Sequence, residues 1–467
     1  MPCDTNNTVL LINPRATYVH EIAQKCYPPM HLLYLAACLR EAGFEPRVLD
    51  ANAMRMTDEA VVAAARACDP LVIGLSLYSE ILRQVRDMTV TLKAACPEAR
   101  IVLGGPHATA VPRSTLEQFA AVDSLLTGET EDSFPALCRA YAEHTAITEI
   151  PGVIYREAER IVQGPAHTFP DVNTIPWPAR ELVEPAYREK RYYTLMVRRR
   201  PVDTLFTSRG CPFNCGFCYN FRFKYRTRTP EQVVAELESI RARGIRDIEI
   251  CDDTFTIDRA RALEIFDRIV KAKLNVSFRI KSRVDVFTEE LARKGREAGV
   301  YLVAFGMESG SQRILDAMQK KITLEMSARA CELTRKYGML SHSSWVIGYP
   351  GETPETVEQT VDFILKHRPS TANVAVLRPY PETLAYQTAK NSGTLVGDWR
   401  ADADQMPWVR LPWAQDRRVL DELCKRVMRR IYFTPYYMRS FAGQILRGAN
   451  WTLLRYALQE ARKNLRT

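Results

Sequence analysis

The 467-residue sequence contains no apolar run of the roughly 18 residues that a membrane-spanning helix requires. Its first fifteen residues have no basic stretch ahead of an apolar one, so we expect no signal peptide. Twelve cysteines are scattered along the chain, and without a sign of secretion they do not predict a disulfide framework. These absences argue against an integral membrane protein and a disulfide-rich secreted protein, and they favour a cytoplasmic location.

Two further absences narrow the function. The pattern G-x-G-x-x-G of dinucleotide-binding folds does not occur, and no repeat of solenoid length is present. The charge is unevenly placed, with twelve Lys and Arg against three Asp and Glu from Arg417 to the end. Such a segment is typical of contact with nucleic acid, an anionic membrane or an anionic substrate, unless it is simply a solvated face.

Apolar runs alternate with helical patterns over the first third of the chain. Runs such as "TVLLIN" and "ARIVLGG" predict buried strands, and stretches such as "HLLYLAACLREAG" predict helices between them. The alternation predicts an α/β fold with a doubly wound, Rossmann-like parallel sheet over residues 1–145. The Pro-rich stretch that follows, including "PDVNTIPWPARE", predicts a linker over residues 146–195.

The alternation resumes after this linker. Six strands, from "VDTLFTS" to "TANVAVLRPY", come with intervening helical patterns and give six βα-type units over residues 196–390. Six units fall short of the eight that close a TIM barrel, so we expect an open, partial (β/α)6 barrel. Residues 391–467 predict a C-terminal helical region.

Three cysteines lie within eight residues of one predicted loop. The stretch "TSRGCPFNCGFCYN" ends the first barrel strand and carries Cys211, Cys215 and Cys218 in a C-x3-C-x2-C array. Barrel enzymes form their active sites from the loops that follow the strands. Four thiolates close a [4Fe-4S] cluster, so three leave one iron open to a substrate or cofactor. Zinc is the alternative, but its usual paired C-x2-C units and histidines do not lie nearby.

This array, with the aromatic Phe217 before its last cysteine, resembles the signature of radical S-adenosylmethionine (SAM) enzymes. The resemblance implies that the three cysteines hold a [4Fe-4S] cluster and that SAM chelates its open iron. It further implies that reductive cleavage of SAM gives a 5′-deoxyadenosyl radical, with an external electron donor of the flavodoxin or ferredoxin type.

The same resemblance implies SAM contacts at the ends of the later strands. Tyr219 and the glycines of "VIGYPGET" would lie on the adenine side, and "FGMESGS" would bind the ribose. "ICDDTF" stands where many relatives carry a Gly-Gly-Glu-type motif for the SAM amine, and "KSRVD" offers a guanidinium to the SAM carboxylate. The expected SAM contacts are Phe217, Tyr219, Asp252, Asp253, Arg283, Glu308, Ser309, Gly348 and Gly351.

Simpler structural roles compete with some of these contacts. Glu308 would instead form a salt bridge at the barrel mouth with Arg283 as its partner, and "GYPGET" would be only a turn that caps the helix from Glu355. No catalytic residue is assigned, and Tyr219 and Cys251 are the candidates. Cys251, on the second barrel strand, either faces the substrate or is a small buried apolar residue.

Small and polar residues also end three strands of the first domain, where an open parallel sheet binds its ligands. The stretches are "GLSLYSE", "LGGPHAT" and "TGETE". They resemble the cobalamin-binding domain that precedes the barrel in a large subfamily of radical SAM enzymes. The expected cobalamin contacts are Gly74, Ser76, Tyr78, Gly104, Gly105, His107, Gly128 and Glu129. A domain without cofactor that only docks a partner is the alternative.

The motif D-x-H-x-x-G, which supplies a histidine to cobalt in other cobalamin proteins, is absent. The sequence therefore assigns no lower cobalt ligand. His31 either approaches the corrin or simply occupies a helix N-terminus, and His107 is more readily a contact of the nucleotide tail or a structural residue than an axial ligand.

The resemblance therefore implies a cobalamin-dependent radical SAM methyltransferase that methylates an unactivated carbon of a small natural-product or lipid-like molecule. A ring-forming or rearranging enzyme without net methylation, such as an oxidative cyclase, uses the same cofactors and stays an alternative. A nucleic-acid substrate is disfavoured, because the cysteine pattern and helical tail differ from those of methylthiotransferases.

The C-terminal stretch "RRIYFTPYYMRSFAGQILRG" mixes Arg with Tyr, Phe, Leu and Ile. It lies on an anionic membrane, covers a hydrophobic substrate, or packs as a helical cap over the barrel mouth. Nothing in the sequence predicts an obligate assembly, so we expect a monomer.

Overall fold

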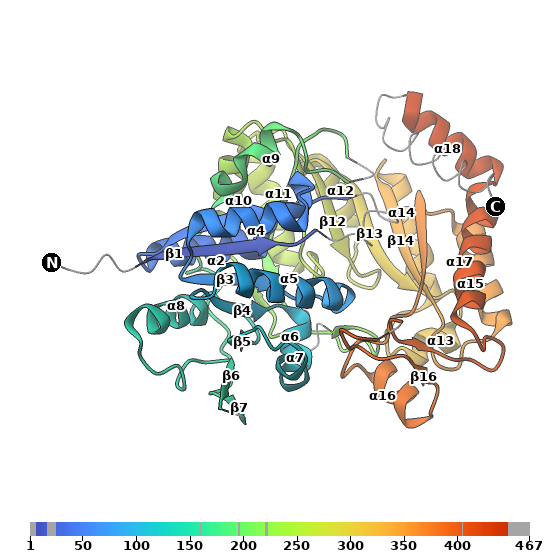
Figure 1. Ribbon diagram of the computed structural model, residues 1–467. Helices are drawn as coiled ribbons and strands as arrows, with labels where there is room; N and C mark the ends of the chain where they lie inside the picture. The colour runs from blue at the N-terminus through green and yellow to red at the C-terminus, as the bar shows by residue number, and fades with distance from the viewer. Residues whose placement is uncertain are drawn as a thin grey trace. The chain divides into compact units, whose positions relative to one another are not determined.

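The computed structural model describes residues 6–15, 25–158, 160–194, 197–219, 223–403 and 405–446 (Figure 1). The described chain forms two compact units. The first unit is built from Met1–Tyr192 together with Asp398–Met406, and the second from Tyr193–Gly397 together with Pro407–Thr467.

The first unit is built on a seven-stranded sheet with the strand order β2-β1-β3-β4-β5-β6-β7. Strands β1 to β5 are parallel in the order 2-1-3-4-5, which is the flavodoxin-like arrangement. The order reverses between β1 and β3, so a ligand crevice is expected outside the carboxyl ends of these two strands. The strands are β1 Thr8–Asn13, β2 Glu45–Asp50, β3 Val72–Ser76, β4 Arg100–Gly104, β5 Ser124–Leu126, β6 Val153–Glu157 and β7 Arg160–Gln163.

Helices cover both faces of this sheet, as the doubly wound prediction requires. Helices α2 (Met30–Glu41) and α8 (Ser133–Glu143) pack with one apolar cluster. Helices α4 (Asp58–Cys68), α5 (Leu82–Ala95) and α7 (Pro112–Gln118) pack with a second cluster. Because both faces are covered, β3 is buried at every residue, which explains its continuous apolar sequence. The short helices are α3 Ala51–Met54, η1 Ser79–Ile81 and α6 Pro106–Ala110.

Residues 146–195 differ from the predicted linker. Strands β6 and β7 extend the first sheet antiparallel, with Val153 opposite Leu126, so this sheet is mixed and not wholly parallel. Helices η2 (Arg180–Val183) and α9 (Glu184–Arg188) follow, and the buried Tyr192 donates its hydroxyl to Asp50 at 2.8 Å. An antiparallel pair needs no crossover helix, so strand–helix alternation does not reveal it.

The second unit contains a sheet of six parallel strands in the order β15-β14-β13-β12-β11-β8. This confirms the six βα-type units and the partial barrel. The strands are β8 Val202–Leu205, β11 Asp247–Ile250, β12 Ser277–Ser282, β13 Val300–Glu308, β14 Leu340–Ile347 and β15 Thr371–Val376. The helices are α10 Pro230–Ala242, α11 Arg259–Lys271, α12 Glu289–Ala298, α13 Gln312–Ala317, α14 Leu324–Lys336 and α15 Pro354–His367.

Side-chain caps fix where most of these helices begin. A threonine or aspartate stands just before each of α10, α11, α12, α14 and α15, and its side chain accepts a hydrogen bond from the backbone N–H three residues on. Such caps satisfy backbone donors that the first helical turn leaves unpaired. The loop that follows each strand therefore ends at a defined point.

The strands of the second sheet alternate in burial. On β12, Phe278 and Ile280 are buried, whereas Arg279 and Lys281, which alternate with them, keep part of their surface accessible. Strand β14 repeats this pattern over eight residues. Successive side chains of a strand point to opposite faces, so the apolar face packs under the helices and the inner face of the barrel stays accessible.

The region after residue 390 is not wholly helical as predicted. After α16 (Leu384–Asn391), strands β16 (Leu395–Val396) and β17 (Trp408–Val409) form an antiparallel pair. Helix α17 (Arg417–Tyr432) packs against β15 and α15, and α18 (Pro435–Leu446) follows it. The rest of the predicted basic tail, residues 447–467, lies outside the described residues. None of the helices in the described ranges is long and apolar enough to cross a membrane.

Candidate functional site

The cysteine loop connects two short strands that pair with each other, β9 (Ser208–Arg209) and β10 (Arg226–Thr227). Cys211, Cys215 and Cys218 lie on this loop, where each is half-buried and none forms a disulfide. The loop is also anchored in its middle. The N–H of Gly216 donates to the carbonyl of Met318 at 2.7 Å, and the Gly216 carbonyl accepts from the N–H of Ala385 at 2.8 Å.

Asp252, which follows β11, fixes the start of the loop. Its carboxylate is buried and accepts hydrogen bonds from the Thr207 N–H at 2.6 Å and from the Thr207 and Ser208 hydroxyls. Asp252 thus holds the strand end ahead of the cysteines, and its contact with the SAM amine stays a prediction. Its neighbour Asp253 is half-buried. Burial of Cys211 raises the pKa of its thiol, and the negative charge of Asp253 raises that pKa further.

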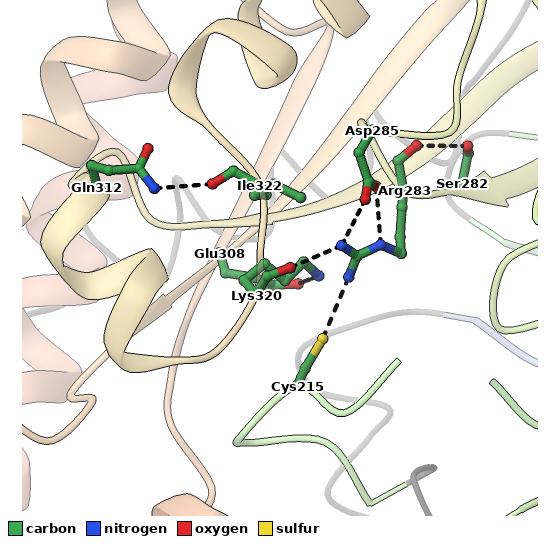
Figure 2. A network of polar contacts seen from close by, with 8 residues as sticks. All are labelled: Cys215, Ser282, Arg283, Asp285, Glu308, Gln312, Lys320 and Ile322. Carbon is green, nitrogen blue, oxygen red and sulfur yellow. Dashed lines mark hydrogen bonds and ion pairs between the residues drawn. The ribbon is translucent and has the colours of Figure 1, made fainter. Parts of the chain in front are cut away.

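Arg283 reaches the cysteine loop from the end of β12 (Figure 2). Its Nε and Nη2 donate to the Asp285 carboxylate at 3.0 and 2.9 Å, and Nη2 also donates to the Lys320 carbonyl at 2.8 Å. Its Nη1 lies 3.5 Å from the Sγ of Cys215. The guanidinium also stacks over the ring of Phe213, 3.8 Å from its centroid. Arg283 therefore presents positive charge to the Cys215 sulfur and is paired with Asp285.

Glu308, at the end of β13, forms a buried ion pair with Lys320, with Nζ and Oε1 2.9 Å apart. The salt bridge considered from the sequence therefore exists, but its partner is Lys320 and not Arg283. Burial lowers the pKa of Lys320, but the charges of Glu308 and Cys215 outweigh burial and raise it overall. The Lys320 ammonium also lies 5.6 Å from the ring centroid of Phe217.

The turn after β14 has the shape that its glycines predict. Gly348 and Gly351 have φ values of +95° and +86°, which residues other than glycine rarely adopt. Glu352 is 1% exposed and accepts a hydrogen bond from the Gly348 N–H through Oε2, while Oε1 has no partner in the described part of the chain. Burial raises the pKa of Glu352 to about 7. Thr353 caps α15, so this stretch is both a shaped turn and a helix cap.

Two other residues expected at SAM lie close to this region. Ser309 is buried, accepts a hydrogen bond from the Ser311 N–H at 3.1 Å and lies beside Thr360 of α15. Its hydroxyl therefore lies close to α15, and its contact with the ribose stays a prediction. Tyr219 packs edge-to-face with Phe223 beside the last cysteine.

The cysteine loop fits a [4Fe-4S] cluster by its donor chemistry. Three thiols project from eight residues, and two cations, Arg283 and Lys320, interact with Cys215. Cysteine sulfur is the usual protein ligand of such clusters. The described ranges hold no group of three His, Cys, Asp or Glu side chains placed to share a single metal ion. Cys251 lies elsewhere on the inner face, and burial raises its pKa to about 12, so it is a protonated thiol at neutral pH.

The strand ends of the first unit gather polar groups at β3 and β4. The Ser79 hydroxyl and His107 Nδ1 are 2.8 Å apart, and His107 Nε2 is buried without a partner in the described chain. His31, at the start of α2, lies edge-to-face with Tyr78 and also has a buried Nε2 without a described partner. Burial lowers the pKa of both histidines to about 4, so both rings are neutral. Buried polar atoms are nearly always paired, so these atoms fit a polar cofactor at this edge.

The structure shows what surrounds three glycines of the predicted cobalamin set. Gly74 lies in the middle of β3, where an added Cβ would be 2.9 Å from Leu11 and 3.1 Å from Phe134, so it is a packing residue of the sheet. Gly128, with φ +76°, lies under the ring of His167. Gly105, with φ +96°, lies against the backbone of Leu77 and starts α6. Ser76, Gly104 and Glu129 lie at or just after the strand ends, as predicted.

Comparisons with known proteins agree with this architecture. The Radical SAM superfamily model matches residues 205–364, and the B12 binding domain model matches residues 18–138. An uncharacterized methyltransferase of Pyrococcus horikoshii is 30% identical over 437 residues, which cover 92% of each chain. The anaerobic magnesium-protoporphyrin IX monomethyl ester cyclase of Rubrivivax gelatinosus is 27% identical over 77% of this chain and 66% of the cyclase. The solved radical SAM methyltransferase TsrM of Kitasatospora setae has the same fold, with a TM-score of 0.71 at 22% identity over 92% of this chain and 84% of TsrM.

Fold and site thus define a radical SAM enzyme with an N-terminal cobalamin-binding domain. The chain belongs to the family of cobalamin-binding radical SAM enzymes. The comparisons confirm the enzyme class of this chain. They also confirm its three cofactors, which are the [4Fe-4S] cluster, SAM and cobalamin. The individual contacts to SAM and cobalamin stay predictions.

Proposed function

We propose that this protein methylates an unactivated carbon of a small-molecule substrate. The observation that carries the proposal is the match to a methyltransferase over 92% of each chain, which includes both cofactor domains. The solved TsrM has tryptophan bound as its substrate, which supports a small molecule here. These matches do not identify the substrate of this protein.

The residues of this chain have three tasks in such a reaction. When bound, the cluster and SAM supply the oxidant that removes a hydrogen atom, and cobalamin supplies the methyl group. Cys211, Cys215 and Cys218 hold the cluster. Arg283 places its positive charge beside the Cys215 sulfur, with Nη1 3.5 Å from Sγ. Asp252 and the Glu308–Lys320 pair fix the surrounding backbone and keep buried charge paired. The half-exposed inner face of the second sheet receives the substrate.

The proposal is tested on protein purified without oxygen and reconstituted with iron, sulfide and hydroxocobalamin. We expect about four irons and about one cobalt per chain. Turnover should form S-adenosylhomocysteine beside 5′-deoxyadenosine, and the product should gain the mass of one methylene group. Iron without cobalt would contradict the proposal.

A ring-forming reaction is the second candidate, because the Rubrivivax cyclase matches 77% of this chain. It predicts 5′-deoxyadenosine and a cyclised product without S-adenosylhomocysteine. The same assay therefore separates the two. We also propose a flavodoxin- or ferredoxin-like electron donor and a monomer, which light scattering of the reconstituted protein tests.

A further inference from the structure

The inner face of the second sheet carries a row of four residues in register. Lys281 on β12, Ala304 on β13, His342 on β14 and Thr371 on β15 are successive partners in the parallel pairing. Partners in register point to the same face of a sheet. The first three of them keep part of their surface accessible, whereas their outward-facing neighbours on these strands are buried. This row therefore gives the inner face of the partial barrel accessible surface, which we call the hollow.

Lys281 brings an unbalanced positive charge into this hollow. Its Nζ donates to the Cys251 carbonyl at 3.3 Å, and no carboxylate within the described ranges lies within ion-pair distance of it. The other cation of β12 is different, because Arg279 pairs with Glu249 at 3.3 Å. A cation held against a neutral carbonyl keeps donors for an anionic oxygen, with which its hydrogen bonds are stronger than with neutral groups.

The residue beside Lys281 in this row is small. Ala304 stands between Lys281 and His342 in the register, and the Cα atoms of these two are two strand spacings, or about 10 Å, apart. His342 is itself fixed, since its Nδ1 lies 2.8 Å from the Thr371 hydroxyl. The row thus has a cation on one strand, an imidazole two strands away, and a small, partly accessible residue between them.

The upper limit of the hollow is the network next to the cysteine loop. Gly306, two residues after Ala304 on the same face of β13, lies under the Glu308–Lys320 pair, with Lys320 Nζ 3.1 Å from the position of an added Cβ. Lys320 in turn acts electrostatically on Cys215. A molecule in the hollow would therefore lie one layer of side chains below the cluster loop.

We propose that the substrate is an organic anion whose carboxylate or phosphoryl group binds Lys281 in this hollow, with its remainder reaching toward the cluster loop. This inference rests on the proposed function, because it names the class of molecule that the barrel accepts. Binding is measured without turnover, so its failure is distinguishable from failure of methyl transfer.

The test uses the reconstituted full-length protein and three probes of one size: benzoate, phenylphosphonate and the neutral benzamide. We expect calorimetry to show binding of at least one anion about tenfold tighter than benzamide, and the preferred anion identifies a carboxylate or a phosphoryl substrate. Lys281→Gln should remove that preference. Lys271→Gln, which neutralises an exposed lysine of α11, is the matched control and should keep it.

Three results would overturn the proposal. The first is benzamide binding as tightly as both anions. The second is Lys281→Gln retaining the anion preference. The third is a loss of affinity for SAM in Lys281→Gln, which would assign the lysine to SAM. Should Lys281→Gln fail to fold, Lys281→Arg retains the charge, so it must retain the preference for the proposal to stand.

Discussion

The two sheets of this protein are both largely parallel and covered by helices, yet their strands differ in pattern. Strand β3 of the first sheet is buried at each of its five residues, because helices cover both faces. Strands β12 and β14 of the second sheet alternate between buried and half-exposed residues. A parallel strand that alternates in this way indicates a covered outer face and an open inner face. The first sheet is thus part of a packed core, whereas the second sheet has an accessible inner face that can contact a substrate.

The largest effect expected from this division comes from the cluster loop. Cys215→Ala should lower iron from about four to below about one per chain, because two thiols cannot hold the cluster. Cobalamin binding should change by less than about twofold, since the B12-binding match ends at residue 138. Iron analysis and the visible spectrum of bound cobalamin measure both. Cys96→Ser, in the first unit, is the control, and full iron in Cys215→Ala would show that the loop is not the cluster site.

The hydrogen bonds of a buried carboxyl group can be compared between the two units. Asp50 accepts hydrogen bonds from Asn13, Ala53 and Tyr192, whereas Glu352 has one oxygen without a described partner. The folded protein holds the Glu352 proton with a pKa of about 7, above the ordinary 4.5. This group therefore stabilises the fold fully below about pH 4.5, and that stabilisation is lost as the pH rises through 7. The loss is on the order of 3 kcal/mol.

Glu352→Gln should remove this loss between pH 5 and 8, because an amide does not ionise. Urea unfolding of the second unit at several pH values measures it. Glu355→Gln alters an exposed carboxyl of the same turn and should leave the pH dependence as in the wild type. Parallel slopes for wild type and Glu352→Gln would refute the assignment.

A matched pair of added groups tests packing against openness directly. Gly74→Ala should lower the free energy of unfolding by about 1–3 kcal/mol, because its Cβ would crowd Leu11 and Phe134. Ala304→Val adds volume to the hollow and should cost less than about 1 kcal/mol, while weakening anion binding. Denaturant titration of both variants gives the comparison. Equal losses at the two sites would mean that the second sheet is as packed as the first.

The smallest effect is expected at the α17–α18 corner. Phe433 and Met438 are 72% and 56% exposed there, beside a basic helix. If this corner contacts an anionic membrane, flotation with anionic vesicles should fall about fivefold in Phe433→Ser with Met438→Ser. Val270→Ser removes an apolar group that is 48% exposed on α11 and is the control. Absence of flotation in low salt would rule the contact out.

Most of the fold follows from local patterns in the sequence. The five parallel strands of the first sheet and the six of the second come with helices that bury one face, and this gives strong alternation. The sequence did not predict strands β6 and β7, because they are short, contain charged residues and lie next to Gly and Pro. Their pairing depends on the exposed edge of β5, which no local pattern encodes.

The site is less readable than the fold. The cysteine spacing predicts the cluster loop because the ligands are neighbours in the chain. The sequence does not indicate a role for Lys320. Lys320 lies beyond α13 in the chain and contacts Glu308 only in the folded protein. Adjacent residues such as Asp252 and Asp253 cannot be told apart by spacing, and the structure uses Asp252 to hold Thr207. Gly74 looked like a strand-end glycine but is covered by side chains from β1 and α8.

The excursion Asp398–Met406 bears on how the protein is made. Ala401 is buried in the core of the first unit, donates its N–H to Gln118 at 2.8 Å and accepts from Arg83. On the ribosome, the N-terminal part of a chain generally folds first. Here the first 192 residues emerge with a gap in one core that a segment some two hundred residues later must fill. Its completion therefore waits for synthesis of nearly the whole barrel, and a fragment that stops at the first boundary would leave that gap open.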